Sequence, residues 1–421
     1  MKHAGKVAIV DPEYQSLGGH HLTSLELLER ALHPLCPACH VNSRSPQEIA
    51  NVLKRVHLDF VTDPAQPARR RRIRNSNPAR WYLMQAVRRL KGLPADTIDG
   101  TDYADEMFAV LSRYGPGDHL IFPTTKVDTH ASLLAAIARI QPDNMPHLHL
   151  RFLEYAPKHD RSLATQCFGR LATLSRMTNR IHIYTETETL RRNLIDRFGF
   201  EKIGRVILQP SRITSPACEK RPSDNQKIRI GYVGGNLRKD KGYERLPAIL
   251  SLASRKMAGA PYADTVRFVI QIADSRRGQR LKRRLRGSGA IPSGQLDFVS
   301  GPLDLTEFSA LLASCDLLLF PYTRDKSEQM ISSGILIDSV INGVPAICPP
   351  VPTLTEFIST ETGAVADSDE EFAEAIMRLI SNIGAYKAQA ELASEKYADA
   401  WRSNDLVDLI RDDLQTVQTS I

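Results

Sequence analysis

Short apolar runs alternate with longer stretches of helical periodicity along the chain. KVAIV at residues 6–10 has the pattern of a short buried strand. After a loop that contains Gly18 and Gly19, apolar residues recur at helical spacing from Leu22 to Leu32. The order strand, glycine loop and helix is the usual opening of a doubly wound α/β domain.

The same alternation continues and then restarts after a break. Residues 209–227 contain three prolines and no periodicity, which predicts a linker between two domains. Strands are predicted before the linker at 119–123, 147–152 and 181–184, with a helix at 130–140, and after it at 228–233, 267–272, 296–299, 317–320 and 346–348, with helices at 243–253 and from 370 to about 418.

Chain length supports two domains, because 421 residues exceed one ordinary hydrophobic core. The hydrophobic content of 42% and charged content of 24% are normal for a globular protein. We therefore expect an α/β protein with two Rossmann-like halves. The predicted bounds are 1–208 for the first domain, 209–227 for the linker, 228–383 for the second domain, and 384–421 for C-terminal helices.

Nothing in the sequence predicts export or a membrane span. No stretch reaches 18 apolar residues, and the N-terminus lacks the apolar core and cleavage site of a signal peptide. Cys36 and Cys39 form a CxxC near His33 and His40, but no second ligand pair has the spacing of a zinc site. We expect reduced, mostly buried cysteines and a cytoplasmic protein, with a peripheral location at the inner face of a membrane as the alternative.

The formal net charge of +7 is concentrated in one segment. Residues 66–92 carry nine lysines and arginines and no acidic residue, with the highest density at ARRRRIRN, residues 68–75. This segment is either a solvated basic helix face or a contact surface, through residues 68–91, for anionic lipid headgroups, an anionic glycan or a lipid-diphosphate acceptor. Nucleic acid is not expected, because Trp81 and Tyr82 are the only aromatic residues there.

Two segments of the second half have the chemistry of a diphosphate site. The first follows the strand at 228–233, where Gly234 and Gly235 permit close backbone approach and Arg238 and Lys241 offer positive charge. These two cations are our candidates for the catalytic diphosphate pair, the alternative being surface cations without a ligand.

The second segment brings small residues to the start of a helix. Ser332, Ser333 and Gly334 precede a helix-like run, residues 335–341, which Asn342-Gly343 stops. Backbone N–H groups at such a helix N-terminus can bind a diphosphate.

This order of motifs, with Gly343-Val344-Pro345, resembles the nucleotide-sugar site of family-4 retaining glycosyltransferases of the GT-B fold. The resemblance is best in the C-terminal half and weak in the N-terminal half. It implies two Rossmann-like domains facing a cleft, a C-terminal helix that crosses back, and transfer from a UDP- or GDP-sugar. It also implies that the leaving phosphate itself takes the acceptor proton, with neither metal nor cofactor, and with the nucleotide sugar as substrate.

The resemblance also assigns individual donor residues. The family's Gly-Arg-Leu is Gly235-Asn236-Leu237 here, so Arg238 is the substitute for the missing arginine. Of the two acids in the family pattern, the one that holds the ribose corresponds to Asp338, and the one that touches the sugar is replaced by Met330. The remaining donor-binding candidates are Gly301 and Pro302 at the nucleobase and Ser332, Ser333 and Gly334 at the phosphate.

Acceptor or sugar binding is expected in the first domain. Gly18, Gly19, His20 and His21 follow the first strand, where open α/β sheets bind ligands. His130 and Glu154 each follow a later strand and are secondary candidates for acceptor binding or a structural role.

Three functions remain open at this point. The leading one is a retaining hexosyltransferase acting on a polysaccharide, lipid-linked glycan or protein acceptor. The second is a nucleotide-sugar epimerase or hydrolase on the same fold. The third is a non-catalytic GT-B partner subunit, for which Asn236 and Met330 are the support.

Overall fold

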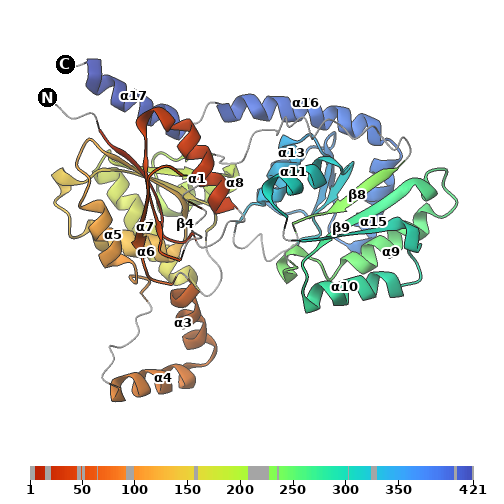
Figure 1. The fold of residues 1–421 in the computed structure, drawn as a ribbon, viewed down its shortest axis with the longest axis horizontal. Helices are drawn as coiled ribbons and strands as arrows, with labels where there is room; N and C mark the ends of the chain where they lie inside the picture. The colour runs from red at the N-terminus through yellow and green to blue at the C-terminus, as the bar shows by residue number, and fades with distance from the viewer. Residues whose placement is uncertain are drawn as a thin grey trace. The chain divides into compact units, whose positions relative to one another are not determined.

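The computed structural model forms two compact α/β units (Figure 1). Unit 1 comprises the described parts of 1–208, 329–331 and 403–421, and unit 2 those of 209–328 and 332–402. The structure describes residues 5–14, 20–44, 49, 53–63, 65–91, 99–155, 160–206, 227–234, 237–301, 303–323, 330–402 and 405–419.

Unit 1 is built on a seven-stranded parallel sheet with the order β3-β2-β1-β4-β5-β6-β7. From β1 the chain adds β2 and β3 toward one edge of the sheet, and then β4 to β7 toward the other edge. This reversal between β1 and β4 is typical of doubly wound dinucleotide-binding folds. The strands are β1 Val7–Asp11, β2 Ala38–Asn42, β3 Val56–Phe60, β4 His119–Thr125, β5 His147–Phe152, β6 Ile181–Thr185 and β7 Gly204–Arg205.

Helices cover both faces of this sheet. Successive side chains along each strand point to opposite faces, so each strand contributes to two cores. Ala8 and Val10 of β1 join the core under α5 to α8, whereas Val7 and Ile9 join the core under α1 and α17. The C-terminal helix α17 thus completes unit 1. The helices are α1 His20–Ala31, α3 Ala65–Ser76, α4 Pro78–Leu90, α5 Ala104–Leu111, α6 Val127–Ile137, α7 Arg161–Met177, α8 Glu188–Phe198 and α17 Asp405–Thr419.

Unit 2 repeats the design with a six-stranded parallel sheet of order β10-β9-β8-β11-β12-β13. Its direction reverses between β8 and β11. Helices α9, α10 and α15 pack their apolar residues on one face of this sheet. The elements are β8 Ile228–Tyr232, α9 Leu246–Met257, β9 Val266–Ile272, α10 Arg276–Gly287, β10 Leu296–Ser300, α11 Leu305–Ala313, β11 Leu317–Leu319, α13 Gly334–Ile341, β12 Ala346–Cys348, α14 Pro352–Thr355, β13 Gly363–Val365, α15 Asp369–Ile380 and α16 Ile383–Arg402.

The predicted α/β class with two doubly wound halves is confirmed, and each predicted strand is present within one or two residues. The helix predicted at 243–253 begins later, at Leu246, with a proline in its first turn. The interior of the predicted linker, 209–226, lies outside the described residues. No helix in the described parts of the chain is both long and apolar enough to cross a membrane. Cys36 is exposed, and the other four described cysteines are buried free thiols.

A ladder of histidines crosses the sheet of unit 1. The His119 Nδ1 and His149 Nε2 atoms are 3.0 Å apart, and His147 Nδ1 is 3.1 Å from His182 Nε2. His149 Nδ1 also lies 3.1 Å from the Tyr184 hydroxyl. Burial, with the charge of His147, lowers the pKa of His119 to about 4, and burial and the neighbouring histidines hold the pKa of His149 well below its usual value.

The ladder predicts acid sensitivity of unit 1. A histidine with a lowered pKa in the folded state stabilises the fold above pH 6.5, and that stability is lost as the pH falls toward its folded pKa. For His119 this amounts to on the order of 3 kcal/mol between pH 6.5 and about 4. We expect the melting temperature to fall over this range, and less steeply in His119→Gln. The exposed His33→Gln is the control, and an equal slope in all three proteins would contradict the prediction.

Candidate functional site

The two loops at the point where the sheet of unit 2 reverses direction lie side by side. Open α/β sheets bind ligands at the carboxyl ends of strands at such a point. The loop after β8 includes Gly234, whose φ is +112°. A Cβ at this position would collide with the Ile335 side chain in the first turn of α13 and would lie 3.9 Å from Lys241 Nζ. The backbone, the Lys241 ammonium and the start of α13 therefore converge at Gly234.

The turn that carries Lys241 is fixed by the loop after β11. Gly242 adopts a φ of +68°, and a Cβ there would overlap the Pro321 carbonyl. The Thr323 amide donates a hydrogen bond of 3.0 Å to the Asp240 carbonyl. Only glycine satisfies both the backbone angle and this close approach.

The loop after β11 is connected in turn to the N-terminus of α13. The hydroxyl of Tyr322 hydrogen-bonds with Ser333 Oγ at 2.9 Å. Ser333 is the N-cap of α13, and its Oγ accepts a bond from the Leu336 amide. Burial raises the pKa of Tyr322 to about 12, so its hydroxyl stays protonated. The N-terminus of α13, where the helix dipole favours anions, is thus held beside the other two loops.

Lys241 is the partly buried cation of this site. Burial, followed by the positive charge of Arg238, lowers the pKa of its ammonium to about 8, although Asp240 opposes the shift. In the described parts of the chain the ammonium has no hydrogen bond or ion pair. A partly buried cation without such a partner gains stability when it binds an anion.

Arg238 occupies a different environment from Lys241. Its Nε donates to Asp240 Oδ1 at 2.9 Å, and its second nitrogen pairs with the other oxygen of the same carboxylate. The guanidinium is half exposed. Arg238 therefore neutralises Asp240 within the loop, which the sequence spacing does not reveal. Gly235 and Asn236 lie outside the described residues.

The remaining donor candidates lie on other segments of the chain. Ser332 and Ser333 are buried at the start of α13, and Asp338 is partly exposed in the next turn. Gly301 follows β10 directly, and Pro302 lies outside the described residues. Met330 has a positive φ of 51° and is grouped with unit 1.

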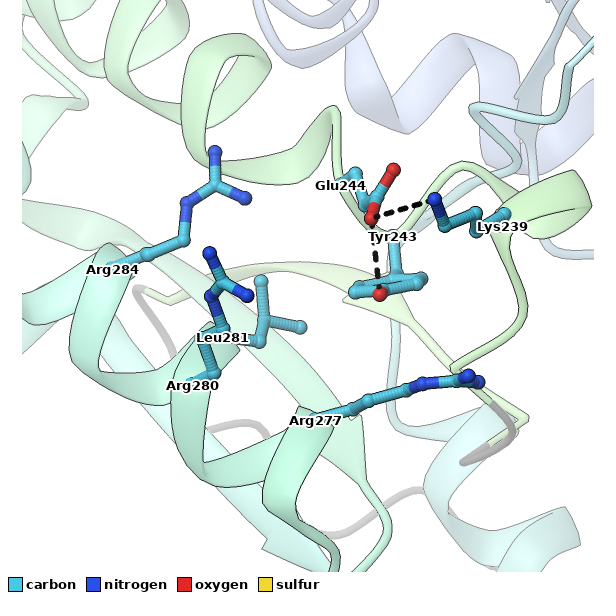
Figure 2. Close-up of a pocket in the computed structure, with 7 residues that line it drawn as sticks. All are labelled: Lys239, Tyr243, Glu244, Arg277, Arg280, Leu281 and Arg284. Carbon is cyan, nitrogen blue, oxygen red and sulfur yellow. Dashed lines mark hydrogen bonds and ion pairs between the residues drawn. The ribbon is translucent and has the colours of Figure 1, made fainter.

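A basic pocket that sequence analysis missed borders the same turn (Figure 2). It has a volume of about 290 Å³, and Arg277, Arg280 and Arg284 point into it from one face of α10. Glu244 is its only carboxylate among the lining residues, 3.9 Å from Lys239 Nζ. The sequence signal for the pocket is the spacing of three and four residues between the arginines, which places them on one helix face. Tyr243 and Leu281 complete the lining.

Unit 1 has a charged cluster at its own reversal point, between β1 and β4. Lys126 Nζ pairs with Glu13 Oε2, and the Thr129 hydroxyl donates to Glu13 Oε1 at 2.7 Å. His21 Nδ1 lies 2.8 Å from Asp11 Oδ2. Sequence analysis found His21 but not its partners, which follow two different strands.

Charge coupling extends through this cluster. Burial lowers the pKa of His21, but the charge and hydrogen bond of Asp11 outweigh it, so the net shift is upward. Glu13, its hydrogen bond and, more weakly, Glu154 raise the pKa of Lys126 against the effect of burial. The predicted residues His21 and Glu154 therefore belong to one electrostatic neighbourhood.

His130 lies apart from this cluster. It is fully buried, its ring packs 4.6 Å from that of Phe152, and its Nε2 is 2.9 Å from Thr125 Oγ1. Burial lowers its pKa to about 3. These contacts give His130 a structural place in the core of unit 1. Gly18 and Gly19 are outside the described residues, and His20 begins α1.

Comparison with known proteins defines the fold. No protein-family model matches the sequence, and no curated protein matches it significantly. Among solved structures, HepE (Alr3699) of Anabaena in complex with UDP is similar with a TM-score of 0.63, 14% identity and coverage of 99% and 100% of the two chains.

Two further structures give the same result. A UDP-forming α,α-trehalose-phosphate synthase from Burkholderia xenovorans has a TM-score of 0.63 at 12% identity, covering 98% of this chain and 99% of its own. WaaG, described as a glycosyltransferase of lipopolysaccharide biosynthesis, has a TM-score of 0.51 at 16% identity, covering 97% and 99%. The chain therefore has the GT-B fold, as its motifs predict.

Proposed function

We propose that this chain is a retaining glycosyltransferase that uses a nucleotide sugar, with a UDP-sugar as the first donor to test. The observation that carries the proposal is the partly buried Lys241 ammonium, which lies beside Gly234 and the N-terminus of α13 and has a lowered pKa. This arrangement suits a diphosphate. Similarity to HepE in complex with UDP supports UDP as the nucleotide.

In the proposed mechanism, positive charge stabilises the leaving nucleoside diphosphate as its bond to the sugar breaks. Lys241 and the N–H groups of α13 bind the phosphates, and Arg238 joins them by exchanging Asp240 for a phosphate oxygen. The departing phosphate accepts the proton of the acceptor hydroxyl, so neither an enzyme nucleophile nor a metal ion is part of the proposal. His21, Glu13 and Glu154 are proposed to bind sugar or acceptor hydroxyls.

A non-catalytic GT-B partner is the second candidate. The pairing of Arg238 with Asp240 favours it, because a guanidinium already bound to a carboxylate is less available to a phosphate. Asn236 and Met330, at positions where the resembled family has an arginine and an acid, point the same way. The epimerase or hydrolase alternative gains no specific support.

The proposed location is the cytoplasm. Free thiols at four buried cysteines are compatible with a reducing compartment. The acceptor is proposed to be a glycan or lipid-linked glycan, and the further choice among acceptors is left to assay.

Calorimetric titration with UDP and GDP in the presence of a chelator tests the proposal. We expect one nucleotide, UDP first, to bind with a Kd of about 1–100 μM, a free energy of about −8 to −5 kcal/mol. Matched titrations with UMP and GMP show how much of the affinity the second phosphate contributes. If neither diphosphate binds, the donor site is not functional, and the partner-subunit hypothesis replaces the transferase.

A further inference from the structure

Helix α4 of unit 1 exposes an apolar stripe that the charge pattern alone does not predict. Figure 1 shows α3 and α4 projecting from the sheet of unit 1. Tyr82 and Leu83 are each 66% exposed, Val87 is 41% exposed and Leu90 is 87% exposed. At 100° per residue these four side chains lie within about 140° of one another on the helix surface. The opposite face carries Trp81, which is buried.

Cations border this stripe on both sides. The exposed Arg89 lies about 20° beyond one edge, at Tyr82, and the exposed Arg80 about 20° beyond the other, at Val87. Lys91 follows the last turn on the Arg80 side and is also exposed. No acidic residue occurs from 65 to 91, so nothing within α3 or α4 neutralises these charges.

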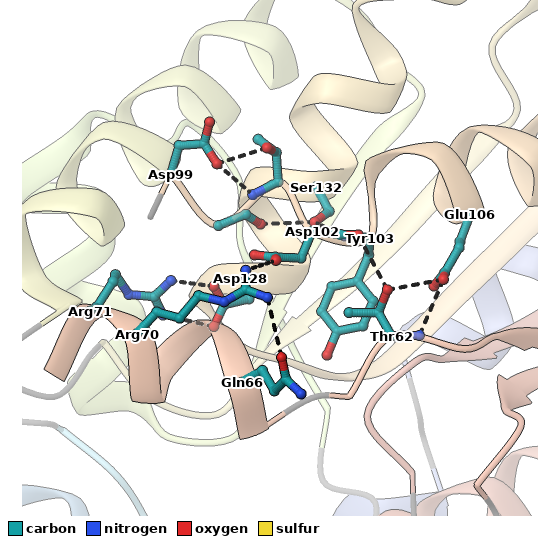
Figure 3. A network of polar contacts seen from close by, with 12 residues as sticks. Thr62, Gln66, Arg70, Arg71, Asp99, Asp102, Tyr103, Glu106, Asp128 and Ser132 are labelled. Atoms are coloured by element: carbon teal, nitrogen blue, oxygen red, sulfur yellow. Dashed lines mark hydrogen bonds and ion pairs between the residues drawn. The ribbon is translucent and has the colours of Figure 1, made fainter. Parts of the chain in front are cut away.

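The helix that supports α4, α3, is fixed to unit 1 by the buried Arg71 and the partly buried Arg70 (Figure 3). Arg71 donates to both oxygens of Asp128 and to Asp160, and Arg70 pairs with Asp102. Arg71 is buried at 5% exposure. Two arginines of the RRRR run therefore hold α3 in place, and Arg69, Arg72 and Arg74 remain exposed.

We propose that α4 binds to the surface of an anionic membrane, with its apolar stripe among the acyl chains and its bordering cations at the headgroups. An apolar face bordered by basic residues is the composition of interfacial helices. Each cation adds to the attraction for anionic lipid. A second copy of this chain is a poor occupant, because it would bring the uncompensated cations of two α4 helices together.

The proposal does not depend on the transferase function, since α4 shares no residue with the diphosphate site. Helix α4 is also a different part of unit 1 from the charged cluster between β1 and β4. Loss of nucleotide binding and loss of membrane binding are therefore separate outcomes, and the melting temperature serves as a test of folding in every variant below.

The apolar arm of the test uses the full chain and vesicles of phosphatidylcholine with or without phosphatidylglycerol. We expect sedimentation with the anionic vesicles only. Leu83→Ser and Leu90→Ser keep the charge and should each weaken binding roughly tenfold, because a buried leucine is lost. The matched control is Met177→Ser, which removes a 76%-exposed apolar side chain of α7 in the same unit.

The charge arm separates α4 from net charge. Arg89→Ala with Lys91→Ala should weaken binding roughly fivefold for each cation removed. Arg276→Ala with Arg283→Ala, two exposed arginines of α10 outside the basic pocket, removes the same charge from unit 2 and should leave membrane binding unchanged. Equal losses in both pairs would show attraction by net charge only and overturn the proposal.

Two other results would also overturn it. Equal binding to uncharged vesicles would contradict the role of the bordering cations. Light scattering that shows a dimer of the unmodified chain, abolished by Leu83→Ser, would assign the stripe to self-association instead of a membrane.

Discussion

Replacing Lys241 with methionine is expected to lower kcat/KM for the nucleotide sugar by about 10²–10³-fold while the fold stays intact. Methionine has a similar length and can occupy the same space beside Gly234, so the variant removes the charge and keeps most of the side-chain volume. Diphosphate affinity should fall with it, because the nearby guanidinium of Arg238 is paired with Asp240. Calorimetry with UDP and steady-state kinetics measure the two effects.

The pH dependence of UDP affinity shows whether Lys241 binds the phosphates or has only a structural role. In the free protein the pKa of Lys241 is about 8, and a bound diphosphate raises it. Below pH 8, but above the second pKa of a phosphate group at about 6, the ammonium is already protonated and affinity is nearly constant. Above pH 8 binding must take up a proton, so affinity should fall by up to about tenfold per pH unit until the bound pKa is reached. Lys241→Met should abolish this slope.

Lys239→Met provides the matched control, since this lysine is two residues away and 77% exposed. It should keep most of the affinity and the whole pH slope. If Lys239→Met and Lys241→Met reduce UDP binding equally, attraction is diffuse and Lys241 is not the phosphate ligand.

Most of the fold could be predicted because unit 2 and much of unit 1 follow simple patterns. Parallel strands buried on both faces read as apolar runs, as in residues 317–319 and 346–348. The strand β3 was missed because its burial is incomplete, and β2 because ACHVN mixes polar and apolar residues although all five are buried. Their place in the sheet comes from pairing with β1, which is tertiary information.

The candidate site could be located but not completed from the sequence. Glycines and cations after β8 gave its position, since such residues are needed wherever a phosphate approaches backbone. The sequence could not show that Arg238 binds Asp240. In a loop, the side chains of two residues that are two positions apart can point toward each other or in different directions. Nor could the sequence show that Asp11, Glu13 and Lys126 lie around His21. The first two residues are at the end of β1 and the third follows β4, and these two strands are more than 100 residues apart in the chain.

The run of four arginines at residues 69–72 shows the same limit of sequence analysis. Here the sequence overstated a feature that it had identified, the exposed positive charge. By composition, residues 69–72 are four equivalent surface charges. In the structure Arg70 and Arg71 are bound by Asp102, Asp128 and Asp160, which are 32 to 89 residues away. Composition therefore overstated the free charge of the segment and missed its apolar stripe.

Replacing Arg71 with methionine should destabilise unit 1 by about 3–5 kcal/mol, because the buried Asp128 would lose both of its bonds to the guanidinium and Asp160 would lose its ion pair with Arg71. Urea unfolding measures the total loss, and hydrogen exchange of α3 and α4 shows where it occurs. Arg72→Met is the matched control from the next position of the same helix. Its side chain is exposed, and a change within about 0.5 kcal/mol is expected.

The loss should depend on pH in a defined direction. Burial raises the pKa of Asp128 to about 6 even though Arg71 opposes the shift, so removing Arg71 raises it further. A carboxyl group with a raised folded pKa stabilises the fold less as the pH rises through that pKa. The deficit of Arg71→Met should therefore be larger at pH 8 than at pH 5, and adding Asp128→Asn should recover part of it at pH 8. A deficit independent of pH would mean that Arg71 acts through packing of its stem. In that case α4 would be held by apolar contacts, and its exposed stripe would not depend on these buried charges.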